Sequence, residues 1–268
     1  MSDQWETGPQ WGAAESESRR LGPRVLAVGF LLVVLFGGGF ALVRWGINGG
    51  SSSSSSRSSS TTPAPPKDAA SSALPAIVLQ PSDVDPTFSV RVLVRGDQLR
   101  GQTTATLDLC NGKFPSEAHR TARLQDALLD AQGTELLSTE AVLYSNPSAT
   151  AQAFSELTRV AASCPGTPVA SPVGEPKVTT KFNPAPDAGW ASVPSVERQA
   201  YSFTTTDSTG KSFPGLAVYL RHGRALMGIY FAQPAAAQPA IGGQTTIEGI
   251  VTLFANRLAQ LPTSVVGQ

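Results

Sequence analysis

An apolar run extends from Val25 to Val43, and none of its side chains is charged or strongly polar. A helix of about 19 residues, rising about 1.5 Å per residue, just crosses a hydrocarbon core of about 30 Å. A helix also satisfies its own backbone groups, which lipid cannot do. We therefore predict a single transmembrane helix at residues 25–43. A cleaved signal peptide is the main alternative, although its apolar core is usually only about 7–15 residues long.

The arginines on the two sides of this run predict its orientation. Three arginines precede it within residues 1–24, whereas Arg44 and Arg57 follow it. Basic residues are enriched on the cytoplasmic side of a membrane. We therefore predict that residues 1–24 form a cytoplasmic tail and that the part after the span is extracytoplasmic. The expected location is the cell membrane, with one crossing.

Residues 44–75 are rich in serine and proline, and nine of the ten residues from 51 to 60 are serine. Such a composition cannot bury a hydrophobic core and behaves as a flexible linker. The folded domain is therefore predicted at residues 76–268. Its length of about 190 residues is ample for one hydrophobic core.

Apolar and polar positions alternate in several segments of this domain, as is typical of half-buried strands. The clearest example is Phe88–Val94. Residues 120–130 fit either a helix or a strand, and we favour a hairpin with residues 135–145 because Gly133 supplies a turn. The other segments predicted to be extended are residues 103–110, 198–206, 213–220 and 225–231.

Two helical patterns interrupt these strands. Asn146 and Pro147 provide an N-cap and a first-turn proline for one helix, which we expect to end near Cys164. Thr245 and Glu248 form the capping-box pattern at the start of the last helix. The proline-rich residues between these helices, 166–194, are predicted to be a loop.

These elements predict an α+β domain. Its antiparallel sheet has two main helices packed on it, and in the simplest arrangement both lie on one face. The whole domain is tethered to a single N-terminal transmembrane helix.

Charge argues against a nucleic-acid partner. The predicted outer domain contains 14 Lys+Arg and 15 Asp+Glu. Nucleic-acid binding normally needs a strong excess of basic residues. The membrane is instead the partner that the sequence predicts directly.

Candidate catalytic chemistry is sparse. His119 lies beside Ser116 and Glu117, which suggests a triad, but neighbours in sequence usually diverge in space. His222 is in a predicted tight turn, and no G-x-S-x-G elbow occurs. Two scattered histidines without a cysteine cluster do not give the spacing of a metal site. We therefore predict no catalytic residues, no metal and no cofactor.

Three short motifs resemble a known family. The chain reads LDLCNGKFPSEAHRTAR at Leu107–Arg123, STEAVLY at Ser138–Tyr144 and SCP at Ser163–Pro165. This resembles the extracytoplasmic sensor-like domains of actinobacteria that are related to the ectodomain of the mycobacterial PknH receptor kinase. The resemblance implies a membrane-tethered α+β domain with a cleft and a structural disulfide. The predicted tail is too short to hold a kinase, so we expect no phosphorylation activity. The family's pattern of two disulfides also cannot be met by two cysteines.

Cys110 and Cys164 are the two cysteines of the chain. Exported proteins favour disulfides, and one pair allows one intramolecular connectivity. We predict that they form a structural disulfide that pins the first helix to the sheet. Two free buried thiols or an intermolecular bridge are the alternatives.

Four residues are candidates for ligand binding. Arg120 and Arg123 could anchor an anionic ligand, because arginine offers paired donors; the alternative is a set of internal salt bridges that fixes the loop after Cys110. Trp190 and Tyr201 could line a pocket or belong to the ordinary core.

We therefore predict a non-catalytic ligand-binding or sensor-like domain of the cell envelope. Its ligand would be a small molecule, a lipid or a cell-wall fragment. One alternative is a structural or assembly subunit that contacts another membrane protein. A hydrolase of envelope material is the other alternative, which the polar residues favour less.

Overall fold

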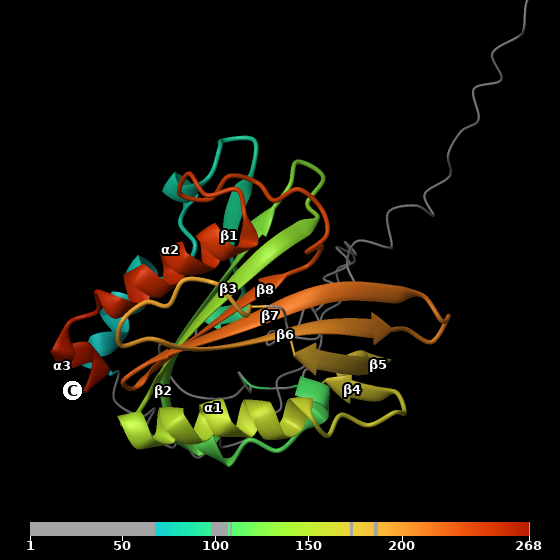
Figure 1. Ribbon diagram of the computed structural model, residues 1–268, viewed down its shortest axis with the longest axis horizontal. Coiled ribbons are helices and arrows are strands. Elements are labelled where there is room, and N and C mark those ends of the chain that lie inside the picture. Colours follow the sequence, from blue (N-terminus) through green and yellow to red (C-terminus); the bar gives the residue numbers. More distant parts are fainter. Residues whose placement is uncertain (1–67, 98–106, 108, 172–173, 185–186, 268) are drawn as a thin grey trace, which may run out of the picture.

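The computed structural model describes residues 68–97, 107, 109–171, 174–184 and 187–267. Within these residues, eight strands form one antiparallel sheet in the order β1-β2-β3-β8-β7-β6-β5-β4. The sheet is strongly twisted, since β2 and β3 rise steeply in Figure 1 whereas β6 and β7 run almost horizontally. The predicted α+β class with an antiparallel sheet is thus confirmed. The strands are β1 (Ser89–Asp97), β2 (Arg120–Leu129), β3 (Glu135–Tyr144), β4 (Val169–Ser171), β5 (Gly174–Pro184), β6 (Glu197–Thr206), β7 (Ser212–His222) and β8 (Ala225–Phe231).

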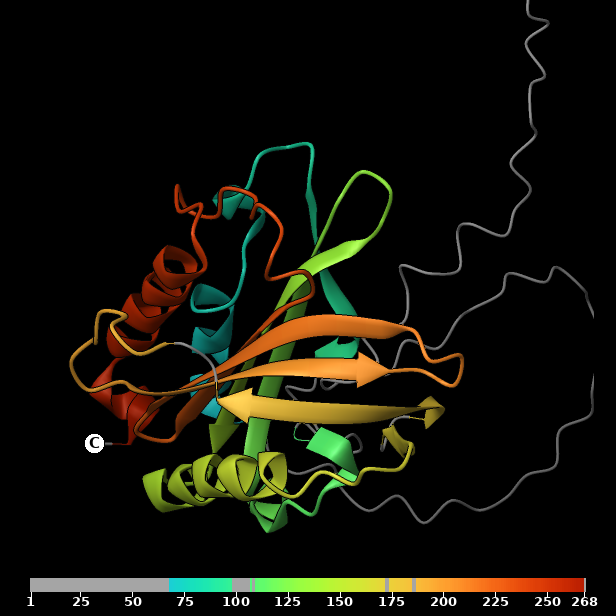
Figure 2. The same ribbon diagram turned by 45° about the vertical axis from the view of Figure 1, so that its right-hand side comes forward.

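The two main helices lie on opposite faces of this sheet, so the prediction that both share one face is wrong (Figures 1 and 2). The reason is visible in β3, whose neighbouring side chains point to opposite faces. Ala141 and Leu143 belong to the core under α2, whereas Val142 and Tyr144 belong to the core under α1. Because both faces are apolar, each needs its own cover. The helices are α1 (Pro147–Ala161), α2 (Ile247–Ala259), α3 (Thr263–Val266) and the 3-10 segments η3 (Ala69–Ala76), η4 (Pro81–Asp83), η5 (Leu109–Asn111) and η6 (Pro115–His119).

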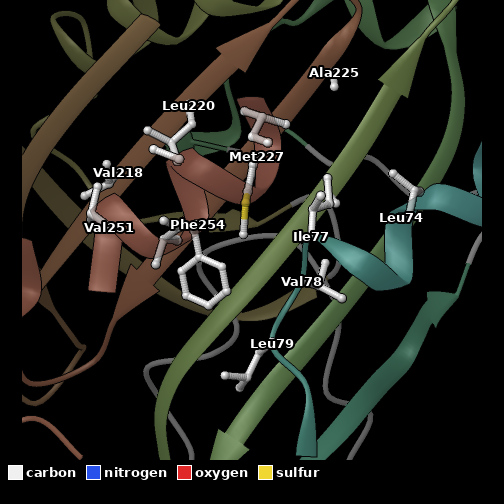
Figure 3. Packing of buried hydrophobic residues seen from close by; sticks show 14 of the residues in the cluster. Leu74, Ile77, Val78, Leu79, Val218, Leu220, Ala225, Met227, Val251 and Phe254 are labelled. Atoms are coloured by element: carbon white, nitrogen blue, oxygen red, sulfur yellow. The ribbon is translucent and has the colours of Figure 1, made fainter. Parts of the chain in front are cut away.

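Figure 3 shows the core on the α2 face. Phe254 and Val251 of α2 lie over Leu220 of β7 and Met227 of β8, and Ile77 enters from the segment after η3. All five side chains are at most 1% exposed. Full burial of such a side chain contributes about 1.5–3 kcal/mol, so α2 and the first residues of the domain depend on each other for cover.

The predicted hairpin formed by residues 120–130 and 135–145 is confirmed as β2 and β3. The predictions at residues 88–94, 198–206, 213–220 and 225–231 correspond to β1, β6, β7 and β8. The predicted loop at residues 166–194 contains two strands that the sequence did not reveal, β4 and β5. β4 is at the edge of the sheet and β5 lies next to it. The two prolines of this pair are near the ends of β5, and proline in a sequence argues against a central strand.

The start of α1 follows the prediction. Asn146 is the N-cap, and its side-chain oxygen accepts a hydrogen bond of 2.9 Å from the Ala149 N–H. Pro147 occupies the first turn, where its missing N–H costs nothing. The helix therefore begins at the residue that the sequence indicates.

The start of α2 differs by one residue from the prediction. Thr246, not Thr245, is the N-cap, and its hydroxyl accepts a hydrogen bond of 3.1 Å from the Gly249 N–H. Glu248 does not close a capping box. Its Oε1 instead accepts a 3.1 Å hydrogen bond from the Ala191 N–H, which attaches the loop before β6 to this helix.

Cys110 and Cys164 form the predicted disulfide, with their Cα atoms 5.5 Å apart. Cys110 does not end a strand, however. It lies in η5 with φ of +53°, so the bond ties η5 to the end of α1. Contact there is close, because a Cβ added to Gly112 would lie 2.5 Å from a methyl group of Val160.

The domain starts earlier than predicted. Residues 69–75, assigned to the linker from their composition, belong to η3, and Leu74 within it is completely buried. The predicted transmembrane run at residues 25–43 lies outside the described residues. Within the described part of the chain, no helix has both the length and the apolar character needed to cross a membrane.

One ion pair fastens this start to the rest of the domain. Arg224, in the turn between β7 and β8, donates from Nη1 and Nη2 to the Asp68 carboxylate at 2.6 and 3.1 Å. Its Nε donates to the Val265 carbonyl at 2.7 Å, and its Nη1 also donates to the Tyr144 carbonyl at 2.9 Å. We call Asp68 and Arg224 the terminal clasp, because they join the first described residue to α3 and to the end of β3.

We expect Cys110→Ala and Cys164→Ala to lower the free energy of unfolding by similar amounts. Each removes the same crosslink, which joins residues separated by 54 positions and is worth about 4 kcal/mol in the chain-entropy model. Urea unfolding of both variants measures the losses. Thiol labelling of the denatured protein, with and without reductant, is the control. Two free thiols before reduction would contradict the bond.

The terminal clasp predicts an acid-sensitive contribution to stability. Hydrogen bonds from Arg224 lower the pKa of Asp68 from its ordinary value of 3.8 to about 2. A depressed pKa stabilises the fold above the unfolded value and loses that effect as pH falls through the folded one. Asp68→Asn should therefore lower the free energy of unfolding at pH 7 by about 1–3 kcal/mol. The gap from the wild type should close between about pH 4 and pH 2; a gap independent of pH would contradict this role.

Candidate functional site

The predicted arginine cluster is inside the protein. The Arg123 side chain is fully buried; its Nε donates to Glu140 of β3, and its Nη2 donates to the Gln125 side-chain oxygen at 2.5 Å. The Tyr230 hydroxyl donates to the other Glu140 oxygen at 3.3 Å. These four side chains lie on the sheet face that carries α1, so Arg123 is held by an internal network.

Burial dominates the electrostatics of this network. It raises the pKa of Glu140 to about 7, and the nearby positive charge of Arg123 opposes that rise. Arg120 is 4% exposed, and its Nε lies 3.8 Å from a Glu117 carboxylate oxygen. The positions of both arginines therefore match the alternative of an internal salt-bridge set, and neither side chain faces open solvent.

The sequence neighbours Ser116 and His119 do not form a catalytic pair. The Ser116 hydroxyl is buried and donates at 2.6 Å to Glu156 of α1. The His119 side chain is exposed. His222, at the end of β7, is buried with its Nδ1 2.7 Å from the Ser195 carbonyl. Ser116 and His222 therefore each join segments that are distant in sequence.

Trp190 and Tyr201 lie against opposite faces of the sheet. Trp190 packs on the core under α2, whereas Tyr201 packs on the core under α1. The Arg198 guanidinium lies 5.4 Å from the Trp190 ring centre and bonds to Asp187 at 3.1 Å. Trp190 and Tyr201 therefore cannot line one pocket, and Trp190 belongs to a folded loop.

An open groove of about 420 Å³ runs between α1 and the strands β6 and β7. We call it the α1 groove. Its α1 wall includes Phe154, Ser155, Thr158 and Arg159, and its sheet wall includes Glu197, Gln199 and Arg221. None of the predicted ligand residues lines this groove, although Tyr201 contacts its Gln199. The lining residues come from segments that are distant in sequence, so only the fold brings them together.

Gln199 has a fixed orientation in the α1 groove. Its side-chain oxygen accepts hydrogen bonds from the Thr158 hydroxyl at 3.0 Å and from the Tyr201 hydroxyl at 3.2 Å. The Tyr201 hydroxyl has one proton and also lies 3.3 Å from the Thr158 hydroxyl, so these three side chains form a closed hydrogen-bonded cluster. With its oxygen turned toward the two hydroxyls, the NH₂ group is the part of the Gln199 amide left to meet a bound molecule. Tyr201, predicted as a ligand residue, thus supports the groove through Gln199.

Two charged side chains of the same groove, Arg221 and Glu197, are also held by partners within the protein. Arg221 makes a two-point ion pair with Glu197, including an Nε–Oε2 bond of 3.2 Å. Its guanidinium also lies 5.8 Å from the Phe154 ring centre. The Glu197 side chain stays 58% exposed, so its carboxylate can still accept hydrogen bonds.

Arg159 adds donors on the helix side. It is exposed, and its Nη2 donates to the Lys113 carbonyl at 2.8 Å. One end of the guanidinium is thereby anchored to the segment after the disulfide. Guanidinium groups have five N–H donors, so others remain for a ligand.

A second hollow, of about 330 Å³, lies beside the first turn of α2 and includes Thr252 and Asn256. Two of its polar side chains are used within the protein, since Thr246 caps the helix and Glu248 accepts from Ala191. The α1 groove is the larger of the two and has charged side chains on both walls, so we take it as the candidate site. Across the described residues, no group of three His, Cys, Asp or Glu side chains is placed to hold a metal ion.

Comparison with known proteins adds little. No family model and no curated protein matches the chain. An uncharacterised protein of Mycobacterium smegmatis, solved by X-ray crystallography, is similar with a TM-score of 0.35 and 11% identity; the match covers 73% of this chain and 98% of that one. This degree of similarity transfers neither fold nor function.

The buried position of Arg123 predicts a structural role. Arg123→Met leaves Glu140 buried without its charge partner, so the free energy of unfolding should fall by about 3–5 kcal/mol. Replacing both partners, as Arg123→Met with Glu140→Leu, should cost clearly less, because no buried charge remains. Urea unfolding measures both. Equal losses in the single and double variants would show that the pair is not the important interaction.

Proposed function

We propose that this protein is a membrane-anchored, extracytoplasmic binding domain of the cell envelope that has no catalytic activity of its own. The observation that carries the proposal is the α1 groove. Its polar side chains are held by partners inside the protein while their free ends face the opening. Such preorganised groups lose little conformational entropy when a ligand binds.

Two other features support the location. The apolar run at residues 25–43 has the length and composition of a membrane anchor. The Cys110–Cys164 disulfide fits an oxidising compartment, where such bonds persist. Together they favour a domain held outside the membrane on a serine-rich tether.

The positions of the candidate catalytic residues favour binding over catalysis. A nucleophile needs a base within hydrogen-bond reach. The Ser116 hydroxyl is directed to Glu156, a buried carboxylate that also accepts from Gln152 at 2.8 Å. His222 is tied to a backbone carbonyl. These contacts hold segments together and leave neither group open to a substrate.

An assembly subunit is the second candidate function, and β1 is the observation that favours it. Among the described strands, β1 lies at the edge of the sheet and pairs with β2. Val92 on this strand is 55% exposed. An exposed edge strand is a ready surface for pairing with another chain.

Hydrogen exchange of the full chain in lipid nanodiscs tests the binding function. When soluble fragments released from the cell envelope are added, amide exchange should slow in the peptides that contain α1 and β6, because a ligand in the groove restrains both walls. Ser155→Trp, which fills the groove from an exposed position, should remove this protection. Protection confined to β1, or none at all, would argue against the α1 groove as a binding site.

A further inference from the structure

We propose that the α1 groove binds a hydroxyl-rich, non-phosphorylated segment of an envelope glycan. This inference rests on the proposed binding function and names its ligand class. It follows from the kinds of polar group that the groove presents and from the small amount of apolar surface that it offers.

The groove presents donors and an acceptor close together. Gln199 offers its NH₂ group, because its oxygen is already engaged by Thr158 and Tyr201. Glu197 on the same strand offers an exposed carboxylate, which only accepts. A sugar hydroxyl both donates and accepts. Neighbouring hydroxyls on one ring can therefore satisfy both side chains.

The same arrangement disfavours a phosphate. A phosphate oxygen acts as an acceptor, and the Glu197 carboxylate would repel its charge. Arg221, which might have attracted a phosphate, is already paired with Glu197 at two points. Arg159 is the other cation of the groove, and the N–H donors that it keeps beyond its bond to the Lys113 carbonyl can donate equally to a sugar hydroxyl.

The groove also disfavours a lipid chain. Phe154 is its aromatic residue, and only 7% of it is exposed. An acyl chain gains its affinity from apolar area removed from water, and this groove has little to offer. The C–H face of a sugar needs less apolar area than an acyl chain. This face can lie on the edge of Phe154 or on the flat Arg221 guanidinium that covers the Phe154 ring.

The size of the groove is compatible with this ligand. Its volume of about 420 Å³ lies in the range of about 300–1,000 Å³ that is usual for small-molecule sites. Because the groove is open, a longer glycan can extend beyond it. The expected affinity is modest, since few direct contacts are available.

The test uses the full chain in lipid nanodiscs with four probes. These are the N-acetylglucosamine–N-acetylmuramic acid disaccharide, maltotetraose, inorganic phosphate and phosphatidylglycerol vesicles. Saturation-transfer NMR and calorimetry should detect at least one of the two saccharides with a Kd of about 1 mM or tighter. Phosphate and the vesicles should not bind to the groove.

Three variants locate the binding. Gln199→Leu removes the donors at nearly constant volume and should weaken saccharide binding at least tenfold. Gln132→Leu makes the same change at an exposed position in the β2–β3 turn and should leave binding unchanged. Ser155→Trp blocks the groove without removing a described contact, so it remains informative if Gln199→Leu does not fold.

The outcomes separate the two proposals. Saccharide binding that is lost in Ser155→Trp and kept in Gln132→Leu supports the glycan inference. Saccharide binding unaffected by Ser155→Trp, or no saccharide binding, overturns it. If phosphate or vesicles bind in a manner sensitive to Ser155→Trp, the binding function stands and the glycan does not. If neither these probes nor envelope fragments reach the groove, both proposals fail.

Discussion

Removal of both sheet faces from water is the constraint on which the rest of this structure depends. Helix α2 covers one face and α1 the other, so the central strands have no solvent side. In β3, nine of ten residues are buried. A charged residue on such a strand can only be tolerated with a partner. Arg123 and Glu140 on neighbouring strands meet this condition, and Gln125 and Tyr230 supply the remaining hydrogen bonds.

Local chemistry made much of the fold predictable from the sequence. Asn146 and Pro147 mark the start of α1 directly, and the alternation at Phe88–Val94 marks β1. The prediction failed where tertiary contacts decide. Residues 69–75 read as linker because they continue the serine- and proline-rich composition before them, yet Leu74 is drawn into the core. The prolines of residues 166–194 concealed two strands, of which β5 pairs with β6 and β4 pairs with β5.

The site was harder to predict than the fold, for a related reason. Arg123 is conspicuous in sequence because it is charged, but its partner Glu140 lies across a strand pair and makes it a core residue. Gln199 is inconspicuous, and its importance comes from two hydroxyls that fix its amide. Patterns in one sequence show the type of each residue, but not which of its polar atoms remains available after the bonds within the protein are made.

The terminal clasp also has a mechanical meaning. Tension in the chain that precedes Asp68 enters the folded domain through the Arg224 ion pair, at the tip of the β7–β8 hairpin. Arg221, on the sheet wall of the α1 groove, lies on the same hairpin a few residues away. If the groove holds a fixed ligand, the load path between ligand and tether is therefore short and runs along one hairpin. The core beneath α2, which holds Leu74 of η3, is the next anchor along the chain and takes up the load when the ion pair breaks.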